Sequence, residues 1–497
     1  MKFFNKKSII VYLGILAFSC IILWGFLSGH YATDTYKISG FGYEKYAIEY
    51  WLKDGRIIMA LVGLLSNIVN VPINIFVIVL SFLGIAISSF IVILLYKIIL
   101  KYKPSDNKFV KFLLLIISYI TIFNFMYIEN LYFVDIFAMS ISILVYILAA
   151  HILCEKNKYY FIKALFLVLI GIFAYQATIS VFIVFVLLFT ILKNVTSIEI
   201  DKKIIKDILE MIIILIISVL LNLVFVKVIS TMCNIPQTRI SGIENILKNI
   251  GIILCGGMLT TLLNTCGLYP KGLLLLFLFI TISIFAFYIY NRKKNESYKN
   301  TWIILFVLLS ILSAFAINLL SVSAFFSGRM RFVIGALIGL IYIYMYVKTD
   351  IFIEKNFYKR ILISVLIFYF IVGNLVYINN INLHKENNII EKNEVAVLDE
   401  YIKKYEEENN IEVKYLACVL DKENRGKAYS NTKHQMVLTY NALKCDWSAK
   451  ETINFYTGRN LLRVYEKFDE EIYNTFVNSG LEYMCIYDIL YVKIYAR

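Results

Sequence analysis

IIVYLGILAFSCIILWGFL, at residues 9–27, determines the class of this protein. The run has no charged side chain, and its length matches the roughly 20 apolar residues of a helix that crosses a bilayer. Similar runs recur along all but the last part of the 497 residues, of which 60% are hydrophobic. Mean hydropathy is +0.74. Soluble domains are about half apolar, so the chain is predicted to be a polytopic membrane protein.

Eleven transmembrane helices are predicted from these runs. They are residues 9–28, 71–98, 109–127, 135–152, 162–174, 178–192, 208–230, 273–290, 302–322, 332–347 and 361–378. Basic residues precede the first span and follow every second span. Because basic loops remain on the cytoplasmic side, the N-terminus is predicted to be cytoplasmic. The membrane is predicted to be the cytoplasmic (plasma) membrane.

Composition changes near residue 380. Residues 380–497 carry a net charge of −3, against +17 for residues 1–379. An odd number of spans leaves the charged tail outside, so an extracytoplasmic domain at 380–497 is expected to follow a transmembrane domain at 1–379. The tail contains a strand pattern at 412–420 and a hairpin pattern at 481–495. The predicted fold is therefore an all-α membrane bundle with a small C-terminal α/β domain.

Two kinds of site are disfavoured by the sequence. The basic residues are scattered between apolar runs, which argues against nucleic-acid binding. The four His and eight Cys have no metal-binding spacing, so no metal site is predicted from them. Residues 249–267 are apolar but rich in Gly and Thr. They are expected to be re-entrant or interfacial, because one more crossing would invert every later basic loop.

The first external loop contains Asp34, and it closes with Asp54-Gly55-Arg56 before a short interfacial helix expected at 57–69. A carboxylate beside the bilayer can act as general base for a sugar hydroxyl. An arginine can hold a lipid-linked phosphate through its planar fork. The competing interpretation is that these acids only keep the loop solvated.

Two further groups lie at the outer ends of predicted spans. Glu129-Asn130-Leu131 and Asp135 occupy one tight turn, and Tyr175-Gln176 another. Acidic groups next to hydrocarbon usually face a cavity or a partner. Asp135 also suits a helix N-terminus, and Gln176 can equally join two helices by hydrogen bonds.

Arg329 and Arg331 form an external basic pair immediately before a span. External arginines oppose the topological bias of membrane proteins. An anionic lipid head group is one explanation. Snorkelling of the long side chains to the interface is the other.

Four motifs, in their order along the chain, resemble those of the serotype-converting glucosyltransferases of bacteria and their phages. They are Asp34-Thr35-Tyr36, Trp51-Leu52-Lys53-Asp54-Gly55-Arg56, Glu129-Asn130-Leu131 with Asp135, and Tyr175-Gln176-Ala177. This family is a branch of the GT-C-type glycosyltransferases. The resemblance implies transfer of a hexose, typically glucose, from a polyprenyl-phosphate carrier to a surface polysaccharide outside the cytoplasmic membrane.

The resemblance also implies roles for individual residues. Asp34 matches the second member of an acidic pair whose first position is Thr33 here, which leaves the need for a divalent cation open. Asp34 and Asp54 are the expected catalytic carboxylates. The donor phosphate is expected to bind Arg56, Arg329 and Arg331. The sugar or the acceptor is expected to bind Glu129, Asn130, Asp135, Tyr175 and Gln176.

Two other classes of protein are alternatives to this enzyme. A lipid-linked sugar flippase needs charged groups across the bilayer centre, whereas the ionisable residues here gather at span ends on one face. A non-catalytic polysaccharide-assembly protein would depend on the tail domain and would tolerate alanine at Asp34 and Asp54.

Overall fold

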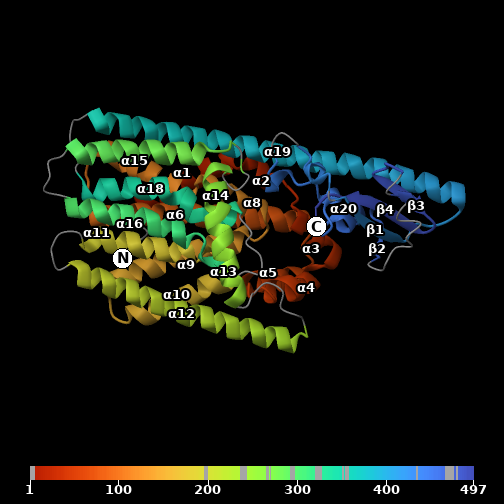
Figure 1. Ribbon diagram of the computed structural model, residues 1–497, viewed down its shortest axis with the longest axis horizontal. Helices are drawn as coiled ribbons and strands as arrows, with labels where there is room; N and C mark the ends of the chain where they lie inside the picture. The colour runs from red at the N-terminus through yellow and green to blue at the C-terminus, as the bar shows by residue number, and fades with distance from the viewer. Residues whose placement is uncertain are drawn as a thin grey trace.

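Helices aligned with the long axis form most of the molecule (Figure 1). The computed structural model describes residues 6–194, 200–234, 243–264, 268, 270–291, 297–319, 327–349, 352, 357–421, 423–431, 435–464, 475–476 and 479–496. The helices up to the C-terminal sheet are α1 Lys6–Ile22, α2 Trp24–Leu27, α3 Thr33–Phe41, α4 Tyr43–Tyr46, η1 Ala47–Leu52, α5 Ile57–Ile68, α6 Ile73–Tyr102, α7 Lys108–Ile122, η2 Phe125–Tyr127, α8 Ile128–Tyr132, α9 Ile136–Glu155, α10 Tyr160–Tyr175, η3 Gln176–Thr178, α11 Ser180–Asn194, α12 Ile200–Met232, α13 Ile243–Ile252, η4 Ile253–Gly257, α14 Met258–Asn264, α15 Leu273–Asn291, α16 Ser297–Ser313, α17 Ala316–Leu319, η6 Gly328–Arg331, α18 Phe332–Lys348 and α19 Phe357–Asn409.

Several of these helices identify a membrane protein. Within the described residues, seven are long and apolar enough to cross a bilayer, or eight if α7 and the bent segment after it form one span. A helix pairs its backbone N–H and C=O groups within its own segment, as hydrocarbon requires. The count of eleven spans stays a prediction.

The segment expected to be re-entrant is helical. It forms α13, η4 and α14, which run across the direction of the bundle helices in Figure 1. Residues Asn245–Leu263 also satisfy the length and composition of a span, so the re-entrant placement stays a prediction. The helix expected at 57–69 is present as α5, and its interfacial placement stays a prediction.

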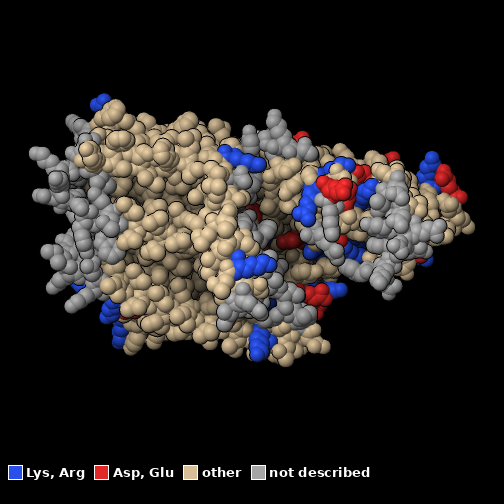
Figure 2. Space-filling model, viewed as in Figure 1, with Lys and Arg blue, Asp and Glu red and all other residues tan. Residues whose placement is uncertain are grey.

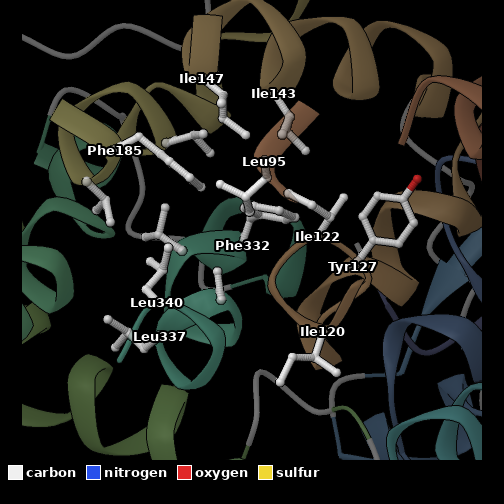
Figure 3. Packing of buried hydrophobic residues seen from close by; sticks show 14 of the residues in the cluster. Leu95, Ile120, Ile122, Tyr127, Ile143, Ile147, Phe185, Phe332, Leu337 and Leu340 are labelled. Atoms are coloured by element: carbon white, nitrogen blue, oxygen red, sulfur yellow. The ribbon is translucent and has the colours of Figure 1, made fainter. Parts of the chain in front are cut away.

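The bundle core is built around α18, of whose most apolar stretch 89% is buried. Figure 3 shows Leu95 of α6, Ile122 of α7, Phe185 of α11 and Leu340 of α18 pointing toward a common centre. All four side chains are almost completely buried. The close approach of α7 to α18 depends on glycine, since a Cβ at Gly339 would lie 2.1 Å from Oγ1 of Thr121.

A Gly339→Ala substitution is expected to lower stability by about 2 kcal/mol, because added atoms in a packed core force neighbours apart. Thr121 cannot yield easily, since its Cα would lie only 3.0 Å from the new Cβ. The measurement is thermal unfolding in detergent. The matched control is Gly373→Ala in α19, where a Cβ meets nothing within 4 Å. Equal midpoints for the two variants would contradict this account of the packing.

A small mixed sheet and short helices complete the C-terminal part. They are β1 Tyr415–Leu420, η7 Arg425–Ala428, η8 Val437–Thr439, η9 Ala442–Lys444, α20 Ala449–Thr457, β2 Leu462–Arg463, β3 Tyr483–Ile486 and β4 Ile489–Ile494. The strand order is β2-β1-β4-β3. β1 runs parallel to β2 and β4, while β3 and β4 form an antiparallel hairpin. The predicted strand and the predicted closing hairpin are confirmed.

The helix α19 joins the bundle to this C-terminal part without a break (Figure 1). Its 53 residues correspond to about 80 Å at 1.5 Å per residue. The hydrocarbon core of a bilayer is only about 30 Å thick. The second half of α19, which carries most of its charged residues, therefore lies outside the membrane. The boundary expected at 379/380 falls within this single helix.

Candidate active site

Asp34 lies in the first turn of α3. This helix begins where the backbone N–H of Ala32 donates to Oγ1 of Thr35 (3.1 Å). A carboxylate suits a first helical turn, because the backbone N–H groups there have no partner within the helix. Thr33 and Thr35 are buried, whereas Asp34 is partly exposed. The Asp34 side chain is therefore accessible on an otherwise packed segment.

Arg56 forms the centre of one charged group. Its Nη1 donates to Oδ2 of Asp135 (2.5 Å). Its Nη2 lies 3.5 Å from Oδ2 of Asp54. The guanidinium also lies 5.0 Å from the centre of the Tyr175 ring. The motif around residue 54 and the turn before α9, predicted to belong to one site, are thus in direct contact.

Asp135 accepts two hydrogen bonds that fix its orientation. Besides Arg56, Nε1 of Trp51 donates to Oδ1 (2.8 Å). The Arg56 guanidinium places a positive charge directly beside this carboxylate. Arg56 is therefore the group that favours the charged form of this carboxylate.

Glu129 and Arg329 form a second charged group. Glu129 is completely buried, and its Oε2 accepts a hydrogen bond from the backbone N–H of Gly328 (2.5 Å). Nε of Arg329 lies 3.8 Å from Oε1 of Glu129. The Arg329 guanidinium also lies 3.9 Å from the centre of the Phe133 ring. Arg329 is thereby held on both sides at the start of α18.

Asp34 connects the two groups electrostatically. Its charge acts on Asp135 in one group and on Arg329 in the other. It also helps to raise the pKa of the buried Tyr46 well above its ordinary value, although burial is the main cause. Carboxylates and arginines predicted from separate loops therefore share one electrostatic environment.

Gln176 and Gly55 shape the contact between the first loop and α10. Nε2 of Gln176 donates to the backbone carbonyl of Asp54 (2.5 Å). Gly55 has φ of +74°, and a Cβ there would lie 2.8 Å from the Gln176 amide nitrogen. The glycine of the Asp-Gly-Arg motif is thus required by both its backbone angle and this close approach.

Asn130 differs from these residues in having an unsatisfied amide. The residue is fully buried, and within the described structure neither its Oδ1 nor its Nδ2 has a hydrogen-bond partner. Because an unsatisfied buried polar group costs about 1–3 kcal/mol, these atoms are suited to bind a polar ligand.

Arg331 takes a different position from Arg329. It is completely buried, and its Nη1 donates to the carbonyl of Ala314 (2.5 Å). Its Nη2 bonds Oδ1 of Asn318, and its guanidinium lies 4.2 Å from the centre of the Phe315 ring. These contacts make Arg331 a support of the turn before α18. The expected phosphate contact of Arg331 stays a prediction.

No role was predicted for Trp51 or Phe133, yet both contact candidate site residues. Trp51 orients Asp135, and Phe133 packs against Arg329. Trp51 is the first residue of the quoted motif that ends at Arg56, and Phe133 lies between Leu131 and Asp135. Aromatic residues at membrane interfaces are common, so their composition alone does not reveal such contacts.

The site lies where the helical bundle meets the C-terminal part. In Figure 1, α3, α5 and α8 occupy this junction. Figure 2 shows acidic side chains recessed in a hollow between the two parts of the molecule. Among the residues that the structure describes, no group of three or more His, Cys, Asp or Glu is arranged to hold a metal ion.

An apolar helical bundle with carboxylates and arginines gathered at one end defines a membrane protein with a polar site at its surface. The family model described as Glucosyl transferase GtrII matches residues 23–341. This match covers more than half of the chain and includes every predicted site residue, so the chain belongs to this glucosyl transferase family. No curated protein and no solved structure matches the chain.

Proposed function

We propose that the protein transfers glucose from a polyprenyl-phosphate carrier to a cell-surface polysaccharide on the outer face of the cytoplasmic membrane. The observation that carries the proposal is the pairing of Arg56 with Asp54 and Asp135 and of Arg329 with Glu129, at the end of the apolar helices where α3 carries Asp34. A carrier lipid held among these helices would bring its phosphate to that end. Membership of a glucosyl transferase family supports the choice of sugar.

In the proposed reaction, Asp34 takes the proton of an acceptor hydroxyl. The hydroxyl oxygen attacks the anomeric carbon, and the bond from that carbon to the phosphate oxygen breaks. The electron pair leaves with the lipid phosphate, whose charge Arg56 and Arg329 neutralise. Asp54 orients Arg56. The sugar hydroxyls are bound by Glu129, Asn130, Asp135, Tyr175 and Gln176.

The orientation in the membrane is supported by charge at the opposite end of the bundle. There, Lys101 pairs with Glu155, and Lys156 pairs with Asp207 and Glu210. Lysines concentrate on the cytoplasmic side of membrane proteins. The site and the C-terminal part would then face outward.

The test is an assay of membranes that contain the protein, incubated with radiolabelled polyprenyl-phosphate glucose and the cell's own surface polymer. Labelled polymer is expected with the lipid-linked donor and not with a nucleotide-linked glucose. Label that crosses the bilayer without joining the polymer would instead indicate a flippase. Equal use of both donors would overturn the assignment of the carrier.

A further inference from the structure

The helix that carries Asp34 is held by residues far away in the sequence. The hydroxyl of Tyr36, in α3, donates to Oε2 of Glu391 in α19 (2.8 Å). The same hydroxyl lies 2.8 Å from the hydroxyl of Tyr456 in α20. Tyr36 is completely buried, and its ring packs on Phe455 at 5.3 Å. We call this set of contacts the Tyr36–Glu391 contact.

Glu391 itself is unusually well bonded for a buried acid. Its Oε1 accepts from the backbone N–H of Ala442 (2.7 Å) and from Nδ2 of Asn387 (3.0 Å). Its Oε2 accepts from Tyr36 and from Nδ2 of Asn388 (3.0 Å). All four donors are neutral. They come from α3, from α19 and from the C-terminal part that follows α19.

A second contact holds the chain on the other side of Asp34. The backbone N–H of Tyr31 donates to Oδ1 of Asn388 (3.0 Å). In return, Nδ2 of Asn388 donates to the carbonyl of Tyr31 (2.8 Å). Residues 31 and 36 are thus both fixed to one stretch of α19, and Asp34 lies between them.

We propose that Glu391 is a positioning residue, which fixes the carboxylate of Asp34 in the candidate active site by holding Tyr36 directly and Tyr31 through Asn388. This inference rests on the proposed role of Asp34 as general base. Glu391 is not proposed to touch the reacting atoms. It acts through its hydrogen bonds to Tyr36 and Asn388. Docking of the C-terminal domain onto α3 is therefore a condition for transfer, because displacing a catalytic group by about 1 Å can cost about 100-fold in rate.

The contact is also expected to depend on pH. Burial raises the pKa of Glu391 from 4.5 to about 7, although its four hydrogen bonds oppose the shift. The ionisable groups facing it are Tyr36, Tyr132, Cys445 and Tyr456. A tyrosine or a buried thiol stays neutral from pH 5 to pH 8, so Glu391 is the group among them that titrates.

The sign follows from the raised pKa. The docked state binds the proton more tightly than an undocked state with an ordinary glutamate. Docking is therefore strongest below about pH 4.5 and weakens as the pH rises to about 7. From pH 5 to pH 8 the docking equilibrium is expected to fall by about 70-fold.

The experiment uses the full-length protein in detergent and in membranes, and compares Glu391→Ala with Glu391→Gln. The alanine variant removes the acceptor of four hydrogen bonds. It is expected to lower kcat about 100-fold, with the KM for the donor unchanged, and to speed hydrogen exchange at residues 31–36. The glutamine variant keeps one acceptor and is expected to recover most of the loss. Hydrogen exchange at residues 31–36 of the glutamine variant, corrected for the intrinsic effect of pH, should be equal at pH 5 and pH 8. In the wild type it should be faster at pH 8.

Glu394→Ala is the matched control. Glu394 lies one turn later on α19 and accepts from Nδ2 of Asn441 (2.8 Å), so it also joins α19 to the C-terminal domain but makes no contact with α3 that the structure records. Its kcat should stay within about twofold of the wild type. If the alanine variant at position 391 does not fold, Tyr36→Phe removes the bridging hydroxyl and keeps the ring packing, with the same expected direction.

The outcomes separate this inference from the proposed function. Unchanged exchange at residues 31–36 in both Glu391→Ala and Tyr36→Phe would overturn the positioning role. So would equal losses of kcat in Glu391→Ala and Glu394→Ala. A wild-type protein that transfers no glucose, yet shows the exchange pattern described, would overturn the proposed function and leave the Tyr36–Glu391 contact established.

Discussion

An Asp34→Asn enzyme is expected to transfer glucose about 10³-fold more slowly than the wild type, because removal of a general base typically costs 10²–10⁴. Asparagine keeps the size of the side chain and its place in the first turn of α3. The KM for the donor should change little, since the arginines that hold the phosphate remain. The measurement is steady-state kinetics in membranes at matched protein levels.

Glu44→Gln is the control for this prediction, because Glu44 is an exposed acid in the same segment between α2 and α5. If both acids only kept the segment solvated, the two substitutions would have equal and small effects. A large loss at position 34 alone supports catalysis. Near-normal transfer by Asp34→Asn would contradict the role of Asp34 and favour Asp54 as the base.

Arg56→Ala is expected to lower kcat by about 10²-fold or more, because a cation that stabilises the leaving phosphate is lost. It should also destabilise the protein by about 3 kcal/mol, since Asp135 would remain buried without its partner. Arg56→Lys keeps the charge beside Asp135 but not the planar fork. Its unfolding temperature should therefore be near that of the wild type, while transfer remains impaired.

Lys53→Ala tests whether any positive charge in the WLKDGR segment suffices. Lys53 directly precedes Asp54 and is only partly buried. Transfer by this variant should stay close to that of the wild type. The role given to Arg56 fails if Arg56→Ala loses transfer only in proportion to the folded protein that is lost.

The membrane helices, and the polar residues at their ends, were largely predictable from the sequence. Long apolar runs identify membrane helices, and polar residues at their outer ends must meet near one surface. Arg56 contacts Asp54 and Asp135 directly, so these two segments lie together, while the roles of their residues stay predictions. The family match agrees with the resemblance that the motifs indicated.

Other features have no local signal. Arg329 and Arg331 are two residues apart, yet a single 3-10 turn sends one toward Glu129 and the other toward Asn318. Hydropathy cannot distinguish these directions. Likewise, the pairing of Tyr36 with Glu391 joins residues 355 positions apart, and no periodicity connects them. Side-chain packing decides both cases.

That separation of 355 positions also orders events during synthesis. At 5–20 residues per second, roughly 20 to 70 s pass between translation of Tyr36 and of Glu391. During this interval the nascent chain already carries Asp34 but lacks the partner that orients it. If Glu391 positions Asp34 as proposed, a ribosome-bound or prematurely ended chain holds this carboxylate loosely, and transfer becomes possible only late in synthesis.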